Sequence, residues 1–336
     1  MNGTDPRVVL IIHPGALGDV LLAVPAVRAI RSRYPSHVLV LLAGAEVGRL
    51  LQLCWVVDRV IPFESGDVTG LFSNAGCSPS LRHLLERCDA AIGWLRDIDG
   101  SLRATLETSG VPWIAVESPT PVPGIHQSDR FMEVVLSLQG GRPTEAGLPL
   151  PASLRQAGRD LLRSTGAEES DGFVVCHPGS GSPVKCVRPD VMAAAIRGFR
   201  ELKLTPVVVG GPADDQAVIR VTEQGLQNLP VLRHQPLELL AGILANACLF
   251  LGHDSGVTHL AAALHVPTVA LFGPTDPCQW APRGEHVSVV RGSNCTCLDW
   301  GQVRNCHGRP CLPDSTEIIL QAAAGVLPRY HSVTKS

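Results

Sequence analysis

The sequence predicts an α/β protein built from two doubly wound parallel sheets that face each other across a cleft. Three observations lead to this prediction. The chain has 336 residues, more than the roughly 250–300 at which a single core stops growing. Short β-branched runs alternate with helical patterns in both halves. Both halves also begin alike, since an apolar strand runs into His13-Pro14-Gly15 near the start and into His177-Pro178-Gly179 downstream.

In the first half, five apolar runs have the length of strands and are separated by helical patterns. They lie at residues 8–12, 38–43, 59–63, 90–94 and 113–116. The first helical pattern places Val20, Val24 and Val27 on one face and arginines on the other. Because such alternation is typical of a parallel sheet covered on both faces, we expect a Rossmann-like domain over residues 1–150.

The second half repeats this organisation, with strands expected at residues 173–176, 206–209, 248–251 and 268–272. Residues 139–151 are rich in glycine, proline and polar side chains, and we interpret them as the linker. The second Rossmann-like domain is expected over residues 151–315, and residues 316–328 are expected to form a helix that packs back on the first domain. Parallel sheets bind ligands at the carboxyl ends of their strands, so the loops after the strands are the candidate sites.

Composition narrows the class of partner. The formal charge of -3 argues against general nucleic-acid binding, which calls for a basic face. No segment has the roughly 18 apolar residues of a membrane span, and none has the layout of a signal peptide. We therefore expect a cytoplasmic protein and leave peripheral membrane contact open. Of the 28 basic residues only Lys185, Lys203 and Lys335 are lysines, so a lysine within a motif is informative.

Eleven cysteines are present. Six are scattered among apolar neighbours and are expected to be reduced core residues; these are Cys54, Cys77, Cys88, Cys176, Cys186 and Cys248. Four others, Cys295, Cys297, Cys306 and Cys311, follow the pattern Cys-x-Cys-x8-Cys-x4-Cys. Four thiolates can hold a structural zinc ion, but the Cys-x2-Cys knuckle is absent. A disulfide or plain reduced thiols are therefore favoured over zinc.

The loop after the first strand carries Gly15, Gly18 and Asp19. Its pattern is not the dinucleotide fingerprint Gly-x-Gly-x-x-Gly, and an aspartate at a helix start would repel a pyrophosphate. Two interpretations of Asp19 stay open: a helix N-cap, or a carboxylate aimed into the cleft that takes a proton from a hydroxyl. His13 and His177 are both expected to be satisfied by the backbone.

The corresponding loop of the second half contains Ser180, Gly181, Ser182 and Lys185. Hydroxyls, amide groups and a lysine can together neutralise a departing diphosphate; the alternative is a solvated turn. Two further glycine turns end strands, at Gly210-Gly211 and at Gly273, and their positions fit the walls of the same nucleotide pocket. For Gly210-Gly211 the alternative is a helix start capped by the aspartate that follows.

Residues 252–277 carry the strongest signal. Asp254, Ser255, Gly256, Val257 and Thr258 stand where an Ala/Leu-rich helix begins. A helix start leaves N–H groups unpaired and carries partial positive charge, which suits a phosphate or pyrophosphate. The alternative is a capped strand-to-helix turn without a ligand.

Three blocks of the chain resemble the heptosyltransferase-like glycosyltransferases of family nine, which have the GT-B fold. The blocks are residues 15–25 with Gly18-Asp19, residues 177–185, and residues 254–276 from Asp-Ser-Gly-Val-Thr-His to Gly-Pro-Thr-Asp. The resemblance implies an inverting, metal-independent transfer of a sugar from a nucleotide diphosphate to a hydroxyl, often of the lipopolysaccharide core. ADP-heptose is the leading donor, and no cofactor is implied. The chain departs from many members after Lys185, where Cys186-Val187 replaces Trp-Pro.

Carried over position by position, Asp19 resembles the general base and Lys185 the cation on the donor phosphates. The helix start that binds the diphosphate corresponds to Ser255, Gly256, Val257 and Thr258. Asp254 resembles the residue that reaches the donor sugar. The partners implied are a nucleotide-diphosphate sugar and a lipid-linked or glycan acceptor, met in the cytoplasm or at the cytoplasmic face of the inner membrane.

Two rival functions remain: a sugar-nucleotide epimerase of the same two-domain architecture, and a non-catalytic nucleotide-sugar-binding protein. An NAD-dependent dehydrogenase is disfavoured because the dinucleotide glycine pattern is missing. The pair Asp97-x-Asp99 is interpreted as a solvated turn and not as a metal site.

Overall fold

The computed structural model describes residues 5–73, 76–136, 147–166, 172–226 and 228–327. The chain divides into two compact units, Met1–Pro149 and Leu150–Ser336. Each unit holds one parallel sheet. Of the predicted linker, residues 139–146 lie outside the described residues.

The first unit has a five-stranded sheet in the order β3-β2-β1-β4-β5, and all its pairings are parallel. Its elements are β1 (Val8–Ile12), α1 (Leu17–Arg33), β2 (Val38–Ala43), α2 (Ala45–Leu53), β3 (Arg59–Pro62), the 3-10 helix η1 (Gly66–Leu71), α3 (Pro79–Leu85), β4 (Cys88–Trp94), α4 (Ser101–Thr108), β5 (Trp113–Glu117) and α5 (Gln127–Leu136). The central strand β1 is apolar and buried along its whole length, as a strand covered on both faces must be.

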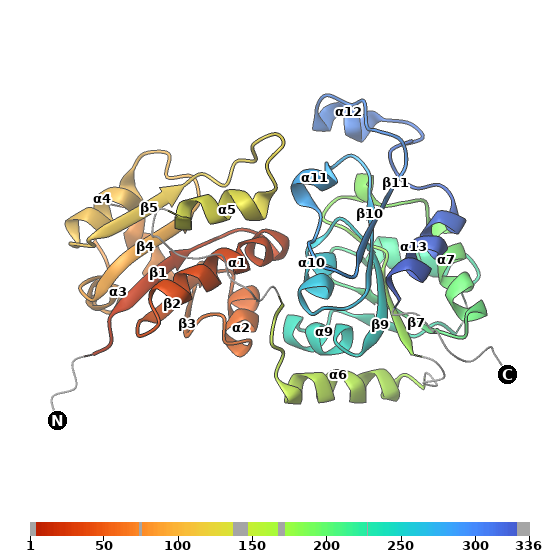
Figure 1. Cartoon of the computed structure of the whole chain (residues 1–336), viewed down its shortest axis with the longest axis horizontal. Coiled ribbons are helices and arrows are strands. Elements are labelled where there is room, and N and C mark those ends of the chain that lie inside the picture. Colours follow the sequence, from red (N-terminus) through yellow and green to blue (C-terminus); the bar gives the residue numbers. More distant parts are fainter. Residues whose placement is uncertain (1–4, 74–75, 137–146, 167–171, 227, 328–336) are drawn as a thin grey trace. The chain divides into compact units, whose positions relative to one another are not determined.

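Helices cover both faces of this sheet. α1 packs against α5, and the two lie side by side in Figure 1. On the other face, η1, α3 and α4 share a core with alternate residues of the strands, such as Leu10 and Val40. The chain runs from β1 outward to β2 and β3, then crosses to β4 and β5 on the other side of β1. The strand order therefore reverses between β1 and β4, where ligands bind in open α/β sheets.

The second unit has a six-stranded parallel sheet in the order β11-β10-β9-β6-β7-β8. Its elements are α6 (Ala152–Ser164), β6 (Phe173–His177), the 3-10 helix η2 (Pro183–Lys185), α7 (Pro189–Glu201), β7 (Thr205–Gly210), α8 (Asp215–Thr222), β8 (Val231–Arg233), α9 (Leu237–Leu244), β9 (Ala247–His253), α10 (Gly256–Ala263), β10 (Thr268–Phe272), α11 (Pro277–Trp280), β11 (Val287–Arg291), α12 (Trp300–Asn305) and α13 (Thr316–Val326). The edge strands β8 and β11 were not among the predicted strands. Here the strand order reverses between β6 and β9.

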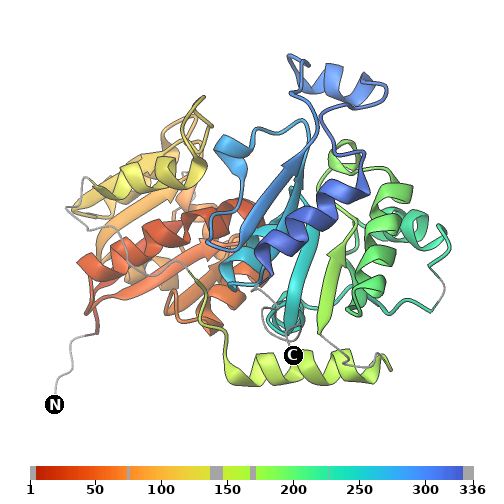
Figure 2. The ribbon, with the colours of Figure 1, turned by 45° about the vertical axis from the view of Figure 1, so that its right-hand side comes forward.

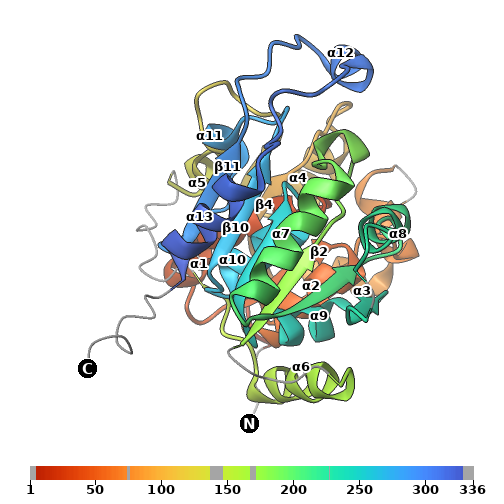
Figure 3. The ribbon, with the colours of Figure 1, turned by 90° about the vertical axis from the view of Figure 1, so that its right-hand side faces the viewer.

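One face of this second sheet is covered by α7, α8 and α13, which share a single apolar core with the strands. Figure 3 shows α7 and α13 lying on the same face. The remaining contacts of the sheet are made by α9 and α10, and α6 packs on α9. This leaves the carboxyl ends of β6, β9 and β10 to the loops that carry the candidate site.

The closing helix α13 belongs to the second unit. Its apolar side, with Ile319, Ala323 and Val326, is buried in the core of that unit. It packs along β10, β11 and α7, and Figure 2 shows it lying across strands of the second sheet. The physical reason is local, because β10 and β11 extend the second sheet and need an apolar helix above them. The predicted contact of α13 with the first domain stays a prediction. Among the described helices, none is both long enough and apolar enough to cross a bilayer.

Candidate active site

Charged and hydroxyl side chains gather at the reversal point of the second sheet. The loop after β6 and the loop after β9 leave neighbouring strands at the same edge, since His177 pairs with Gly252 in the parallel register. The Lys185 Nζ donates to the Asp254 carboxylate at 2.7 Å. The structure thus brings together two residues that lie 69 positions apart in the chain.

Asp254 is the centre of this group. It is 8% exposed, and a buried carboxylate needs partners that replace water. Besides Lys185, its Oδ2 accepts a hydrogen bond from the Thr275 hydroxyl at 2.8 Å. The Ser180 hydroxyl donates to the Asp254 backbone carbonyl at 2.7 Å. Loops from the ends of β6, β9 and β10 therefore meet at one residue.

The start of α10 presents open backbone N–H groups. Ser255 is the N-cap residue, but its side chain accepts no backbone hydrogen bond. Its hydroxyl lies 3.4 Å from the His177 Nδ1 and 3.2 Å from the Thr258 hydroxyl. Within the described part of the chain, the N–H groups of Gly256 and Val257 have no acceptor. Such a helix start can hold an anion.

His177 is held by a carboxylate and not by the backbone as predicted. Its Nε2 lies 2.9 Å from the Asp214 Oδ2, which also accepts from the Gly211 N–H at 2.8 Å. Burial acts to raise the pKa of Asp214, but the hydrogen bond and charge of His177, with the Gly211 amide, outweigh it and lower that pKa. Asp214 is therefore a carboxylate that fixes the turn, and Gly210 packs closely against Val218 beneath it.

His253 stabilises the loop after β6 from below. Its Nδ1 lies 3.2 Å from the Gly179 carbonyl oxygen, and its Nε2 accepts from the Val187 N–H at 3.0 Å. This pattern requires a neutral ring with the proton on Nδ1. Burial lowers the pKa of His253 to about 4, which agrees with a neutral ring. His253 was not predicted as a site residue, although it directly precedes Asp254 in the sequence.

The surroundings of three further predicted donor residues are clear in this structure, and their contacts with the donor stay predictions. Gly181 is exposed and has no atom near its Cα hydrogens, while the Ser182 carbonyl accepts from the Lys185 N–H at 3.0 Å and shapes the turn. A side chain at Gly273 would lie 2.5 Å from Leu312. Gly273 is thus required by packing against the chain near residue 312, whereas its predicted role as a pocket wall stays a prediction.

The cysteine-rich segment approaches the loop after β6. Trp300 lies beneath the Lys185 Nζ, 5.8 Å from the ring centre, and the Arg309 guanidinium donates to the Pro183 carbonyl at 3.2 Å. A cation over an indole face is attracted to it. Neither Trp300 nor Thr275 was predicted as a site residue, and only Thr275 lay within a recognised block.

The four late cysteines form no disulfide in this structure, as plain reduced thiols would not, and a zinc ion held by them stays a prediction. All eleven cysteines are free thiols. Partial burial and the Cys295 and Cys306 thiols raise the pKa of Cys297 to about 11, and burial with Cys295 does the same for Cys311. Among the described residues, no three His, Cys, Asp or Glu side chains form a group that could hold a metal ion.

Asp19 lies near the reversal point of the first sheet, in the first turn of the helix that follows β1. It is the third residue of α1, whose N-cap is Ala16, so Asp19 is not the N-cap. The first turn of a helix favours a carboxylate through its partial positive charge. Gly15 is needed here, since a Cβ would lie 2.7 Å from the His13 ring and 3.0 Å from the Asp19 Cβ.

An aromatic cluster supports this loop. The His13 ring lies 5.6 Å from Trp94 and 5.1 Å from Phe131, centre to centre. Its Nδ1 accepts from the Gly15 N–H at 3.2 Å, as predicted for a backbone partner. Burial lowers the pKa of His13 to about 4, although hydrogen bonding to the Asp19 backbone acts in the opposite direction. His13 is thus a neutral side chain whose packing supports the turn that leads to Asp19.

Asp97 and Asp99 are structural. The Asp97 carboxylate accepts from the N–H groups of Leu102 and Arg103 at 3.1 and 3.0 Å. Asp99 accepts from the Ser101 N–H at 3.2 Å. Both carboxylates cap the start of α4, and their interpretation as a turn and not a metal site agrees with these bonds.

Comparison with known proteins identifies the family. The profile of glycosyltransferase family 9 (heptosyltransferase) matches residues 121–303, which is more than half of the chain. Lipopolysaccharide heptosyltransferase 3 of Escherichia coli is 30% identical over 170 residues, which cover 44% of this chain and 49% of that protein. The match thus spans about half the length of that curated relative.

Two solved structures share the fold. A family 9 glycosyltransferase from Veillonella parvula has a TM-score of 0.79 at 19% identity, with 97% of this chain and 98% of that chain covered. The ADP-heptose lipopolysaccharide heptosyltransferase II of E. coli has a TM-score of 0.71 at 19% identity, with 96% and 98% covered. The predicted fold class, α/β with two Rossmann-like domains of the GT-B type, is confirmed. The family profile, which matches more than half of the chain, shows that the chain belongs to glycosyltransferase family 9 (heptosyltransferase).

Proposed function

We propose that this protein is an inverting, metal-independent glycosyltransferase that moves a heptose from ADP-heptose to a hydroxyl of a lipopolysaccharide-core or related glycan. The observation that carries the proposal is the group around Asp254, where Lys185, Thr275 and the open N–H groups of α10 meet at one sheet edge. Family membership supports the transfer of a glycosyl group, and the name of the E. coli heptosyltransferase II supports ADP-heptose as donor.

The second unit binds the donor in this proposal. The Gly256 and Val257 N–H groups and the Lys185 ammonium contact the diphosphate, while Asp254 and Thr275 face the sugar hydroxyls. As the bond to the sugar breaks, negative charge grows on the leaving diphosphate, and preorganised donors of this kind stabilise it. Because these groups supply the positive charge, the step needs no bound metal ion.

The first unit binds the acceptor. Asp19 takes the proton of the acceptor hydroxyl as its oxygen attacks the anomeric carbon, on the side opposite the leaving diphosphate. One bond forms and one breaks at that carbon, so the configuration inverts. The acceptor is lipid-linked or a glycan, and we propose that transfer takes place in the cytoplasm or at the cytoplasmic face of the inner membrane.

The test is a donor screen followed by transfer. ADP-, UDP- and GDP-linked sugars are added to the purified chain, and the melting temperature is measured, since a ligand of the folded state raises it. We expect ADP-heptose to give the largest rise. Transfer to core oligosaccharides is then followed by mass spectrometry with and without EDTA, and the anomeric configuration of the product is read by NMR.

Each rival function gives a different result in this test. An epimerase would consume the donor without an acceptor and release free sugar. A non-catalytic protein would bind the donor and never consume it. A larger melting shift with UDP- or GDP-sugars would contradict the donor assignment, and loss of transfer in EDTA would contradict metal independence.

A further inference from the structure

Ser255 is the N-cap residue of α10, and its hydroxyl ends a chain of hydrogen bonds that begins in the core of the second unit. The Ser255 Oγ lies 3.4 Å from the His177 Nδ1, and the His177 Nε2 lies 2.9 Å from the Asp214 Oδ2. His177 is 2% exposed and Asp214 is 8% exposed. A buried imidazole thus connects a buried carboxylate to the hydroxyl beside the open N–H groups of α10.

The positions of the protons in this chain follow from the partners. The Asp214 carboxylate can only accept, so the His177 Nε2 carries a proton. The Thr258 hydroxyl donates to the His253 backbone carbonyl. Its oxygen, 3.2 Å from the Ser255 Oγ, can therefore only accept from Ser255. The single hydroxyl proton of Ser255 thus goes to the Thr258 oxygen or to the Nδ1 of a neutral His177 ring.

An anion at the start of α10 changes this arrangement. A phosphate oxygen is a stronger acceptor than a neutral imidazole or hydroxyl, so the Ser255 proton turns to it. The lone pairs of the Ser255 oxygen and of the His177 Nδ1 then face each other with no proton between them. A proton on Nδ1 removes this conflict, because the ring then donates to Ser255 on one side and to Asp214 on the other.

The charges around the ring favour that proton. Asp214 supplies the negative charge that a buried imidazolium requires, and a bound diphosphate adds more. Burial raises the pKa of the Cys186 thiol to about 11 and lowers that of His253 to about 4, so both are neutral near pH 7. Other charged side chains of these loops are paired with each other: Lys185 with Asp254, and Asp215 with Arg233 and His234.

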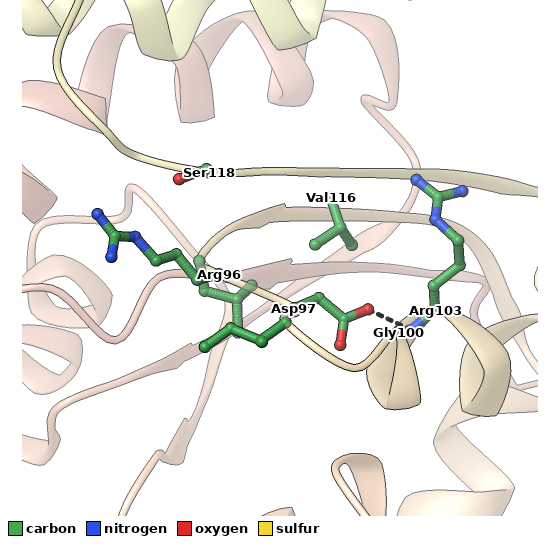
Figure 4. Close-up of a pocket in the computed structure, with 8 residues that line it drawn as sticks. Arg96, Asp97, Gly100, Arg103, Val116 and Ser118 are labelled. Carbon is green, nitrogen blue, oxygen red and sulfur yellow. Dashed lines mark hydrogen bonds between the residues drawn. The ribbon is translucent and has the colours of Figure 1, made fainter.

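The first unit has a histidine at the same place without this chain. The His13 Nε2 is buried and has no hydrogen-bond partner among the residues that the structure describes, and its Nδ1 accepts from the Gly15 N–H. The Asp97 carboxylate, in the loop after the neighbouring strand β4, accepts from N–H groups at the start of α4, one of which is drawn in Figure 4. Of the two rings, only that of His177 has a carboxylate on Nε2, namely Asp214.

We propose that His177 is a positioning residue that takes up a proton when a nucleotide-diphosphate sugar binds, and that it then fixes the Ser255 hydroxyl as a hydrogen-bond donor to the diphosphate. The inference rests on the proposed function in naming the ligand a diphosphate. The proton comes from solvent and returns to solvent when the diphosphate leaves, so the transfer itself consumes none. The imidazolium also places positive charge behind the leaving group, where negative charge grows.

The test counts protons during binding, so it does not depend on transfer. The probes are ADP-heptose and UDP-glucose, whose doubly substituted diphosphates do not titrate near neutral pH. Calorimetric titration of the full chain in two buffers of different ionisation enthalpy gives the number of protons taken up. Nitrogen NMR of isotope-labelled histidine rings shows which ring gains a proton, and the His177 signals are assigned by their loss in His177→Gln.

Two further variants complete the design. Ser255→Ala removes the hydroxyl and leaves the buried pair of His177 and Asp214 in place. His286→Gln changes an exposed histidine of the same unit and is the matched control.

We expect wild type and His286→Gln to take up roughly one proton per bound probe, so that the dissociation constant rises up to about tenfold per pH unit between pH 7 and pH 9. The His177 ring should change from one protonated nitrogen to two. His13, whose pKa burial lowers to about 4, should stay neutral in the same spectra. In His177→Gln the uptake should vanish, and in Ser255→Ala it should fall well below that of wild type. Both variants should bind the probe at least about tenfold more weakly at pH 7, the loss expected for one hydrogen bond to a charged group.

Binding to wild type without proton uptake, a His177 ring that stays neutral in the complex, or undiminished uptake in His177→Gln would overturn the proposal. If His177→Gln does not fold, the comparison of wild type with Ser255→Ala decides, and equal uptake in these two would overturn the proposal as well. A chain that takes up the proton on binding but transfers no sugar contradicts the proposed function alone. A chain that transfers sugar without proton uptake contradicts only the role of His177.

Discussion

Each unit has a His-Pro-Gly turn where the strand order of its sheet reverses, but the side chains around the turn differ between the two units. In both, the chain leaves a central strand through His-Pro-Gly at the point where the strand order reverses. In the second unit His177 is bound to Asp214 and adjoins a group of charged and hydroxyl side chains. In the first unit His13 packs against Trp94 and Phe131, and a single carboxylate, Asp19, follows.

The difference can be traced to one turn. Asp214 comes from the turn after β7, the neighbour reached by the first crossover from β6. In the first unit the corresponding N-cap position, at the start of the helix after β2, is occupied by Gly44 and not by an aspartate. The strand order thus sets where each candidate site lies. Under the proposed function, a few turn residues set whether that site receives the anionic donor or the acceptor hydroxyl.

Asp19→Asn gives the largest effect expected from this comparison. If Asp19 is the base in the first unit, its loss should lower kcat by about 10²–10⁴-fold. The melting shift produced by ADP-heptose should stay unchanged, because the donor groups are in the second unit. A kinetic assay measures the loss of kcat, and a thermal-shift assay measures whether donor binding is retained.

The control for this variant is Asp67→Asn, an exposed carboxylate of the same unit, which should leave kcat unchanged. If the Asp19→Asn variant folds and still transfers sugar at close to the wild-type rate, Asp19 is not the general base.

Lys185→Met should act on the second unit. Removing a preorganised cation from a leaving group costs on the order of 10²–10³-fold in kcat, and the melting shift by ADP-heptose should shrink as well. Lys203→Met, an exposed lysine of the same unit, is the matched control. Full donor binding and turnover in Lys185→Met would argue that the ion pair with Asp254 is only structural.

Strand and loop positions could be read from sequence because buried parallel strands are apolar and the turns after them carry glycine. The contacts between side chains within the site could not be predicted from the sequence. Lys185 and Asp254 were each predicted to contact donor, but their mutual ion pair depends on the strand order, which places β9 beside β6. β8 and β11 were missed because edge strands are short or half-exposed. The closing helix was predicted, but its apolar face alone does not reveal that it packs on the second sheet.

His253→Ala should reduce stability in a pH-dependent way. With a pKa of about 4 in the folded protein and 6.5 as the ordinary value, the unfolded chain binds more protons between these values, so wild-type stability falls as the pH drops from 6.5 to 4. The shift corresponds to at most about 3 kcal/mol. The variant lacks this loss, so the stability gap seen at pH 7.5 in urea unfolding should narrow towards pH 4.

Exposed His286 provides the comparison for this experiment. His286→Ala should change stability little, because the side chain is exposed. A gap for His253→Ala that stayed constant from pH 7.5 to pH 4 would mean that the ring is not held neutral beneath the loop.

The smallest effect is expected from glycine substitutions in the loop after β6, which test how closely this loop packs against Asp214. In Gly179→Ala the new Cβ would lie 1.8 Å from an Asp214 oxygen, and Asp214 cannot yield easily because His177 and the Gly211 N–H hold it. Overpacking of this kind costs about 1–3 kcal/mol, visible in urea unfolding. Gly181→Ala, two residues on, meets no atom within 4 Å and should stay within about 0.5 kcal/mol of wild type. Equal stability of Gly179→Ala and Gly181→Ala would show that the loop after β6 can move away from Asp214.

Gly15→Ala extends the comparison to the first unit, where the new Cβ would lie 2.7 Å from the His13 ring. A similar loss of stability there would show that the His-Pro-Gly turns of both units need a glycine because they pack closely against a neighbouring side chain.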